Sequence, residues 1–292
     1  MNILTWLNNL NVFWSCAGLF LVILLLSLCA KNHQDPRWVF THYENDTGFE
    51  NPYYVFLLGM IGAAYSLFGS ECSASMNEET KDADISSPIA MITSILTAWI
   101  FGFVYLMVLL FSIQDVDVIL TTTFNMPVAQ LFWDAVGPFA TVAFLVLMIV
   151  CQFCSGSTSL TVASRQIFTL ARGGGVPYHD QLQQLNKHQL PGNAVMATSI
   201  LACCFVLPYP LSDYLFEIII SAATITVHTA YSVVLGCRLF VGSHDGKKGR
   251  FHLGYLSKPI TALGFAWTLI AVFVFMLPTC WPIDGKKKKI FQ

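Results

Sequence analysis

Charged residues are scarce in this chain of 292 residues, where Asp, Glu, Lys and Arg make up only 11% of the sequence. A soluble domain has about a quarter of such residues, so this composition excludes an ordinary soluble fold. The net charge of −2 offers no basic surface, and we expect no nucleic-acid partner. The sequence also lacks a glycine-rich phosphate loop, clustered metal ligands and a paired nucleophile and base. We therefore expect neither an enzyme nor a bound cofactor or metal.

Cysteine is present at nine positions, most of them inside apolar runs. Cys151 and Cys154 form a C-x-x-C pair, but no second pair and no clustered histidine accompanies them. We therefore expect the cysteines to be small apolar packing residues rather than disulfide partners or metal ligands.

Apolar residues make up 55% of the chain, and several uncharged stretches reach about 20 residues, which is enough to cross a bilayer as a helix. The sequence predicts an all-α integral membrane protein with about seven transmembrane helices. Ser87 and Pro88 form a typical helix start, and Gly173–Gly175 form a typical helix end. The seven expected spans are Val12–Ala30, Pro52–Asn77 with an interruption, Pro88–Ile113, Pro138–Arg172, Pro191–Leu207, Asp213–Leu239 and Pro259–Leu277.

Lysine and arginine predict the orientation, because they are enriched on the cytoplasmic side. One side of the membrane has only two basic residues before the terminal tail, Lys31 and Arg37. The lysines of residues 283–292 fall on that same side, against the enrichment of basic residues in the cytoplasm. The second, fourth and sixth spans are followed on the other side by nine basic residues: Lys81, Arg165, Arg172, Lys187, Arg238, Lys247, Lys248, Arg250 and Lys258. We therefore expect a cytoplasmic N-terminus at residues 1–11. The N-glycosylation sequon at Asn45 then lies outside.

The second span changes character within the membrane. Seventeen uncharged or apolar residues, Pro52–Phe68, are followed by Gly69, Ser70, Glu71, Cys72 and Ser73. That run equals about 25 Å of helix, so the polar residues would fall deep in the bilayer. Two interpretations stay open: the helix breaks there to line a cavity, or it simply ends at Phe68. Residues 75–78, Ser-Met-Asn-Glu, resemble a capping box that restarts a helix.

Polar residues inside two later spans allow a functional and a packing interpretation. His228 lies mid-span among small and hydroxylated residues that include Thr224, and it can line a cavity and handle protons or form a hydrogen bond between helices. Ser155, Ser157 and Thr158 in the fourth span can face a transport path and a coupled cation, or can pack helices closely.

Five stretches in order resemble permeases of the amino acid–polyamine–organocation superfamily, in the GABA/choline-type branch. The first is the break itself, residues 68–83, which read FGSECSASMNEETKDA. The others are FSIQDVDVIL (111–120), STSLTVASRQIFTLARGGGVP (157–177), PGNAV (191–195) and FHLGYLSKPI (251–260). Two positions depart from the family pattern, since Gly173 replaces a usual acidic residue and His228 a common aromatic one.

The resemblance implies the second half of a five-plus-five inverted-repeat transporter fold, with helices five to eleven of the family in a permease domain over residues 12–282. It implies secondary-active transport of an amino acid or an amine such as GABA or choline, coupled to protons or to sodium, in the plasma or vacuolar membrane. Phe68–Ser73 would hold the substrate amine through carbonyls and an aromatic lid, and Glu71 would act as a gate or proton-coupling group. Since helices one to four and twelve have no counterpart, a non-transporting protein that associates with a full-length permease is the alternative.

Overall fold

The computed structural model describes residues 2–43, 45, 47–67, 69–122, 124, 126–186, 190–207, 209, 213–241, 250–251 and 253–277. These residues form helices and loops, with no strand among them. The chain divides into two compact units, one from Met1–Asp46 and Leu96–Thr161, the other from Thr47–Ile95 and Val162–Asp284. The predicted lysine-rich tail at residues 283–292 lies outside the described residues.

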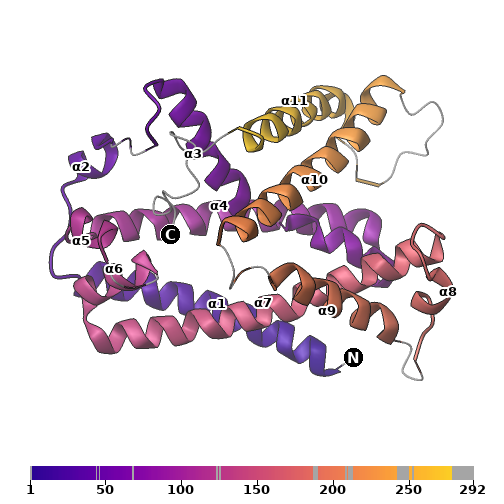
Figure 1. The fold of residues 1–292 in the computed structure, drawn as a ribbon, viewed down its shortest axis with the longest axis horizontal. Helices are drawn as coiled ribbons and strands as arrows, with labels where there is room; N and C mark the ends of the chain where they lie inside the picture. Colours follow the sequence, from indigo (N-terminus) through magenta and orange to yellow (C-terminus); the bar gives the residue numbers. More distant parts are fainter. Residues whose placement is uncertain are drawn as a thin grey trace. The chain divides into compact units, whose positions relative to one another are not determined.

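Seven helices coincide with the seven predicted spans (Figure 1): α1 (Asn2–Cys29), α3 (Pro52–Ser66), α4 (Ala83–Ser112), α7 (Pro138–Arg172), α9 (Gly192–Val206), α10 (Asp213–Phe240) and α11 (Ser257–Phe275). Five of them, namely α1, α4, α7, α10 and α11, are long and apolar enough to cross a membrane. The other two have 15 residues each, about 22 Å of helix, which is less than the roughly 30 Å of a hydrocarbon core. The prediction of an all-α integral membrane protein is confirmed.

Two predicted helix starts are wrong. The first helix begins at Asn2 and not at Val12. The third span begins at Ala83, so Pro88 lies inside the helix. Proline removes only one backbone hydrogen-bond donor, and a contact from a distant part of the chain holds the turn before Pro88. Asp82 and Asp84 both accept hydrogen bonds from the Arg250 guanidinium at 2.6–2.7 Å. Both carboxylates raise the pKa of Arg250, and Asp84 has the larger effect. The guanidinium therefore stays charged at any working pH.

The fourth span matches its prediction at both ends, Pro138 and Arg172. Gly174 has a φ of 69°, and its amide donates to the Ala171 carbonyl while that of Gly175 donates to the Leu170 carbonyl. This pair of hydrogen bonds is a Schellman motif, which glycine allows because it adopts positive φ without strain.

The first unit has its core at one end of α1. Two short helices that the sequence analysis did not predict, α5 (Val116–Leu120) and α6 (Pro127–Val136), lie there, and α6 packs on α1. The rings of Phe132 on α6 and Phe144 on α7 are fully buried and meet edge to face, 5.0 Å between centroids. Further along, α1 runs antiparallel to α7, where Trp14 donates to the Leu147 carbonyl and Ser15 lies 3.5 Å from Cys151.

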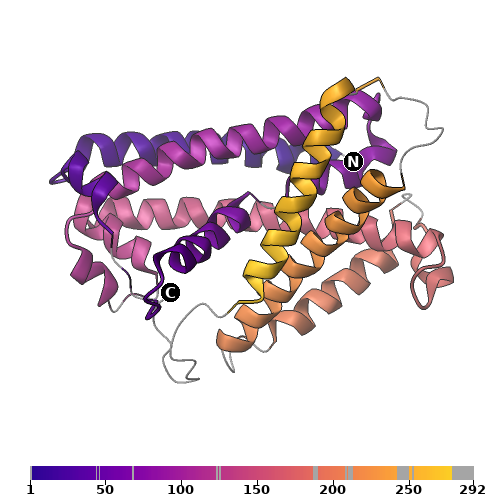
Figure 2. The ribbon, with the colours of Figure 1, turned by 90° about the horizontal axis from the view of Figure 1, so that it is seen from above.

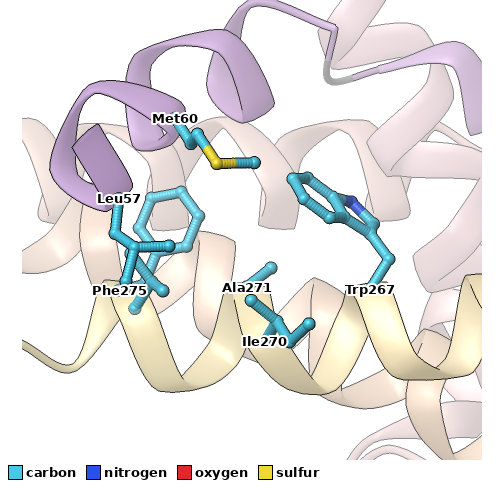
Figure 3. A pocket seen from close by; sticks show the side chains of 7 residues that line it. Leu57, Met60, Trp267, Ile270, Ala271 and Phe275 are labelled. Carbon is cyan, nitrogen blue, oxygen red and sulfur yellow. The ribbon is translucent and has the colours of Figure 1, made fainter. Parts of the chain in front are cut away.

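The second unit is organised around α10 and α11, which lie side by side and antiparallel (Figures 1 and 2). Gly236 on α10 lets the Phe265 ring approach closely, since a Cβ there would lie 3.2 Å from it. On its other side, α11 contacts α3. Figure 3 shows this second contact, where Leu57 and Met60 of α3 face Trp267 and Phe275 across a small apolar cavity of about 20 Å³. The second unit also contains the short helix α8 (His179–Leu182).

Candidate functional site

The predicted interruption of the second span is a real break in the helix. The α-helix α3 ends at Ser66, and Gly69 has a φ of 96°, a left-handed conformation that glycine adopts readily. The chain then continues as a ten-residue 3-10 helix, η1 (Ser70–Glu79). No α-helix restarts at Ser75, so the capping-box prediction is wrong, because the 3-10 turns run through that position and the next α-helix begins at Ala83.

The side chains of the break satisfy their own backbone. Glu71 accepts a hydrogen bond from the Gly69 amide through Oε2 at 3.1 Å. The Cys72 amide donates to the Gly69 carbonyl at 3.1 Å, and the Ser73 hydroxyl donates to the Ser70 carbonyl at 3.2 Å. Gly69, Ser70, Glu71, Cys72 and Ser73 are all half-buried, whereas Phe68 lies outside the described residues. The carboxylate therefore stabilises the unwound turn and still has oxygen lone pairs for another group.

The 3-10 helix is attached to the last third of α7 by two side-chain contacts. Gln166 donates to the Ser75 hydroxyl at 2.9 Å, and the Arg165 guanidinium lies 2.7 Å from the Met76 sulfur. These contacts hold η1 at Ser75 and Met76, beyond the break.

Three polar residues of α10 form a buried strip, which we call the α10 polar strip: Thr224, His228 and Ser232, spaced four residues apart. They are between 2% and 9% exposed. His228 lies 2.9 Å from the Thr224 carbonyl through Nδ1. Because a carbonyl oxygen only accepts, Nδ1 carries the proton in this bond.

The α10 polar strip contacts α11 through Ser232. Its hydroxyl lies 2.8 Å from the Thr268 hydroxyl and 2.9 Å from the His228 carbonyl, and Thr268 donates to the Phe265 carbonyl. The His228 ring lies 5.8 Å from the Phe275 ring. Packing between helices therefore accounts for part of the strip, as one of the two interpretations expected.

Tyr231 on α10 lies within electrostatic range of the break. The Glu71 carboxylate and Cys72 lie close enough to the Tyr231 hydroxyl to interact with it electrostatically. Tyr231 follows His228 by three residues, so the two lie one helical turn apart on neighbouring faces. The second unit therefore carries the Glu71 carboxylate within electrostatic range of the Tyr231 phenol, with His228 one turn before Tyr231 on the same helix. Within the described residues no group of His, Cys, Asp and Glu forms a metal site.

The hydroxyl cluster of the fourth span belongs to the first unit. Thr158 donates to the Asn8 side chain on α1 at 3.1 Å and to the Cys154 carbonyl, while the Ser157 carbonyl accepts from Thr161. Ser155 is exposed. The contact between Thr158 and Asn8 is of the kind that the packing interpretation predicts.

Tyr231, Ser232 and Thr268 were not identified from the sequence. The spacing of Ser232 was a usable signal, since it continues the four-residue interval from Thr224 through His228. Nothing in the sequence pairs Thr268 with Ser232, because that contact depends on how α10 and α11 pack.

These features define a multi-pass helical membrane protein with a broken helix and a buried polar strip in its second unit. A family model described as amino acid permease matches residues 1–288, so the chain belongs to the amino acid permease family. It is 28% identical over 294 residues to the amino-acid permease BAT1 homolog of Oryza sativa subsp. japonica, covering 96% of this chain and 56% of that protein.

Two further relatives come from fungi. The GABA-specific permease of Saccharomyces cerevisiae is 29% identical, with 94% of this chain and 49% of that protein covered. The thiamine transporter thi9 of Schizosaccharomyces pombe is 30% identical, with 78% and 39% covered. The chain therefore spans about half the length of the curated relatives it matches. No solved structure matches it.

Proposed function

We propose that this chain serves the transport of an amino acid or a related amine, such as GABA or a choline-like compound, as a secondary-active permease. The family and the names of the relatives support transport of such small molecules. The observation that carries the proposal is the half-buried Glu71 carboxylate at a positive-φ break in the second span. A broken helix with a carboxylate is suited to bind a cationic amine, because the negative charge of Glu71 lies there with oxygen lone pairs that the Gly69 amide does not use.

Coupling to protons is the second part of the proposal, with sodium as the other candidate ion. Glu71 gains a proton or loses it as the amine binds and leaves, and its hydrogen bond to Gly69 links that change to the backbone of the break. Thr224 and His228 of the α10 polar strip, two turns and one turn before Tyr231, are further candidates for the coupling path. Ser155, Ser157 and Thr158 are weaker candidates, as they lie in the other unit.

The test is uptake of labelled GABA, choline and amino acids by this chain in cells that lack their own permeases. We expect saturable uptake that increases as the outside medium becomes acidic. Glu71→Gln keeps the shape of the side chain and removes the titration, so uptake should lose its dependence on pH. Asp180→Asn, at an exposed carboxylate of α8, is the matched control and should leave the profile unchanged. A normal pH profile in Glu71→Gln would exclude Glu71 from coupling.

The alternative is a permease-like membrane protein that does not transport and associates with a full-length permease. This alternative is included because the chain matches only about half the length of its relatives. It predicts no saturable uptake by this chain alone, and a changed rate when a full-length permease is expressed with it. Uptake by the chain alone would exclude it.

The membrane and the orientation also belong to the proposal. We place the chain in the plasma or vacuolar membrane with the N-terminus in the cytoplasm, which exposes Asn45 to glycosylation on the opposite side. Asn45 is exposed. Treatment with a glycosidase should increase the mobility of the protein on a gel and leave Asn45→Gln unchanged. An unmodified chain would contradict this orientation of the loop.

A further inference from the structure

A cavity of about 470 Å³ lies between η1, the last turns of α7 and the segment that joins α8 to α9, all in the second unit. Its lining includes Ser75, Arg165, Thr169, Arg172, Gln183 and Leu190. Arg165, Thr169 and Arg172 are spaced by four and three residues, so they lie on one face of α7. Two guanidinium groups therefore line the same opening.

The position of the cavity along α7 places it at the edge of the bilayer. From Pro138 to Arg165 the helix rises about 40 Å, more than the roughly 30 Å of a hydrocarbon core. Arg165 and Arg172 are separated by a further rise of about 10 Å. A helix that enters a bilayer of about 40–45 Å near Pro138 therefore reaches the far headgroup layer at Arg165, and Arg172 lies on the water-facing side of that layer.

The chemistry of the lining fits a phosphate diester. Guanidinium groups bind phosphate through paired N–H donors, and the hydroxyls of Ser75 and Thr169 add further donors. The Arg172 guanidinium lies over the Phe168 ring, 5.9 Å from its centroid, which restricts its orientation. Each guanidinium has five N–H donors, so a phosphate would add to the contacts that Arg165 and Arg172 already make, such as that of Arg165 with Met76. Leu185, Leu190 and Pro191 give the cavity an apolar side.

We propose that this cavity binds the headgroup phosphate of an anionic phospholipid from the adjacent leaflet. The arginines and hydroxyls hold the phosphate, and the apolar side accommodates the glycerol and the start of the acyl chains. Basic pockets at the cytoplasmic ends of transmembrane helices bind anionic headgroups in this way. The proposal does not depend on transport by the chain, because it concerns the end of α7 and not the break at Gly69.

The test uses the full chain, purified in detergent and placed in nanodiscs of phosphatidylcholine, alone or with phosphatidylserine or phosphatidylinositol. Lipid retention is measured by native mass spectrometry, and Tm by thermal unfolding. We expect an anionic lipid to be retained by the unmodified chain and to raise its Tm. Arg165→Gln and Arg172→Gln should each lower retention about fivefold, the effect of about 1 kcal/mol per basic residue at such a surface.

Arg238→Gln is the matched control, because Arg238 is a basic residue near the end of α10 that contacts Ser257 and does not line this cavity. It should retain anionic lipid like the unmodified chain. Thr169→Val removes a donor at an exposed position of α7, so it tests the cavity even where a variant of Arg165 fails to fold. We expect it to lower retention measurably.

Three results would overturn the proposal. The first is equal retention of phosphatidylcholine and the anionic lipids. The second is unchanged retention in Arg172→Gln and Thr169→Val. The third is complete displacement of the lipid by millimolar inorganic phosphate, which would assign the cavity to a free anion.

Discussion

The Glu71 carboxylate turns back along the chain and accepts a 3.1 Å hydrogen bond from the amide of Gly69, two residues earlier. Gly69 adopts a left-handed backbone conformation just after the end of α3, and its hydrogen bond to Glu71 stabilises that conformation. The residue that carries charge into the break is therefore also the one that holds the break in shape. A change in its protonation must alter the hydrogen bond that it makes to the backbone.

Gly69→Ala tests whether the break depends on the left-handed conformation. No atom lies within 4 Å of the place where a Cβ would stand, so the cost is strain of the backbone alone, about 1–2 kcal/mol. We expect a lower Tm and reduced uptake. Gly62→Ala, at an open position within α3, is the control and should leave Tm equal or higher. Equal Tm values for Gly69→Ala and the unmodified chain would contradict the positive φ at this position.

The buried contact between Ser232 and Thr268 should couple α10 to α11. Ser232→Ala, Thr268→Val and the double variant form a double-mutant cycle in which we expect a coupling energy of about 0.6–1 kcal/mol, as for other hydrogen bonds between membrane helices. The free energy of unfolding in mixed micelles is the measurement. Thr226→Val, exposed on the same helix, should show no coupling to Thr268→Val. Additive losses in the Ser232 cycle would show that the 2.8 Å contact adds no stability.

Phe132 should be among the most sensitive positions of the first unit. It is 1% exposed and packs edge to face on Phe144, so Phe132→Ala leaves a cavity and should cost about 3 kcal/mol or more. Phe139 is 90% exposed, and Phe139→Ala removes the same atoms from the surface of α7. We expect the first variant to unfold at a markedly lower temperature and the second to resemble the unmodified chain. Similar Tm values for the two variants would contradict the placement of α6.

The ion pairs of Arg250 should fix the start of α4. Arg250→Gln and Asp84→Asn each remove the bidentate contact, and we expect both to lower Tm slightly at low ionic strength. The pairs are exposed, so the difference should disappear in about 1 M salt, where charges are screened within about 3 Å. Arg37→Gln, at an exposed arginine of the first unit, serves as the control. A decrease in Tm that persists in high salt would point to a packing role for Arg250.

The positions of most long helices could be predicted from the sequence, because apolar run length and the residues at helix ends are local properties. Pro138, Arg172 and the glycines after it define α7 without any contact from elsewhere. The two failures have different origins, one long-range and one local. Ser87 and Pro88 resemble a helix start. The helix begins earlier, at Ala83, because Arg250 binds Asp84, which lies 166 residues before it in the sequence. The short α6 was missed, although Pro127 and Gly137 mark its ends.

The sequence by itself determined the class of this protein and its family, and it limited the second span to a break or an end near Gly69, since hydrophobic run length, motif order and glycine chemistry are readable along one chain. Only the tertiary structure decided that Glu71 bonds to Gly69, that Arg250 bonds to Asp82 and Asp84, and that Ser232 meets Thr268. The physical reason is that a hydrogen bond depends on distances of a few ångströms between residues up to 168 positions apart. Helix packing sets those distances, and no periodicity within a single span records them.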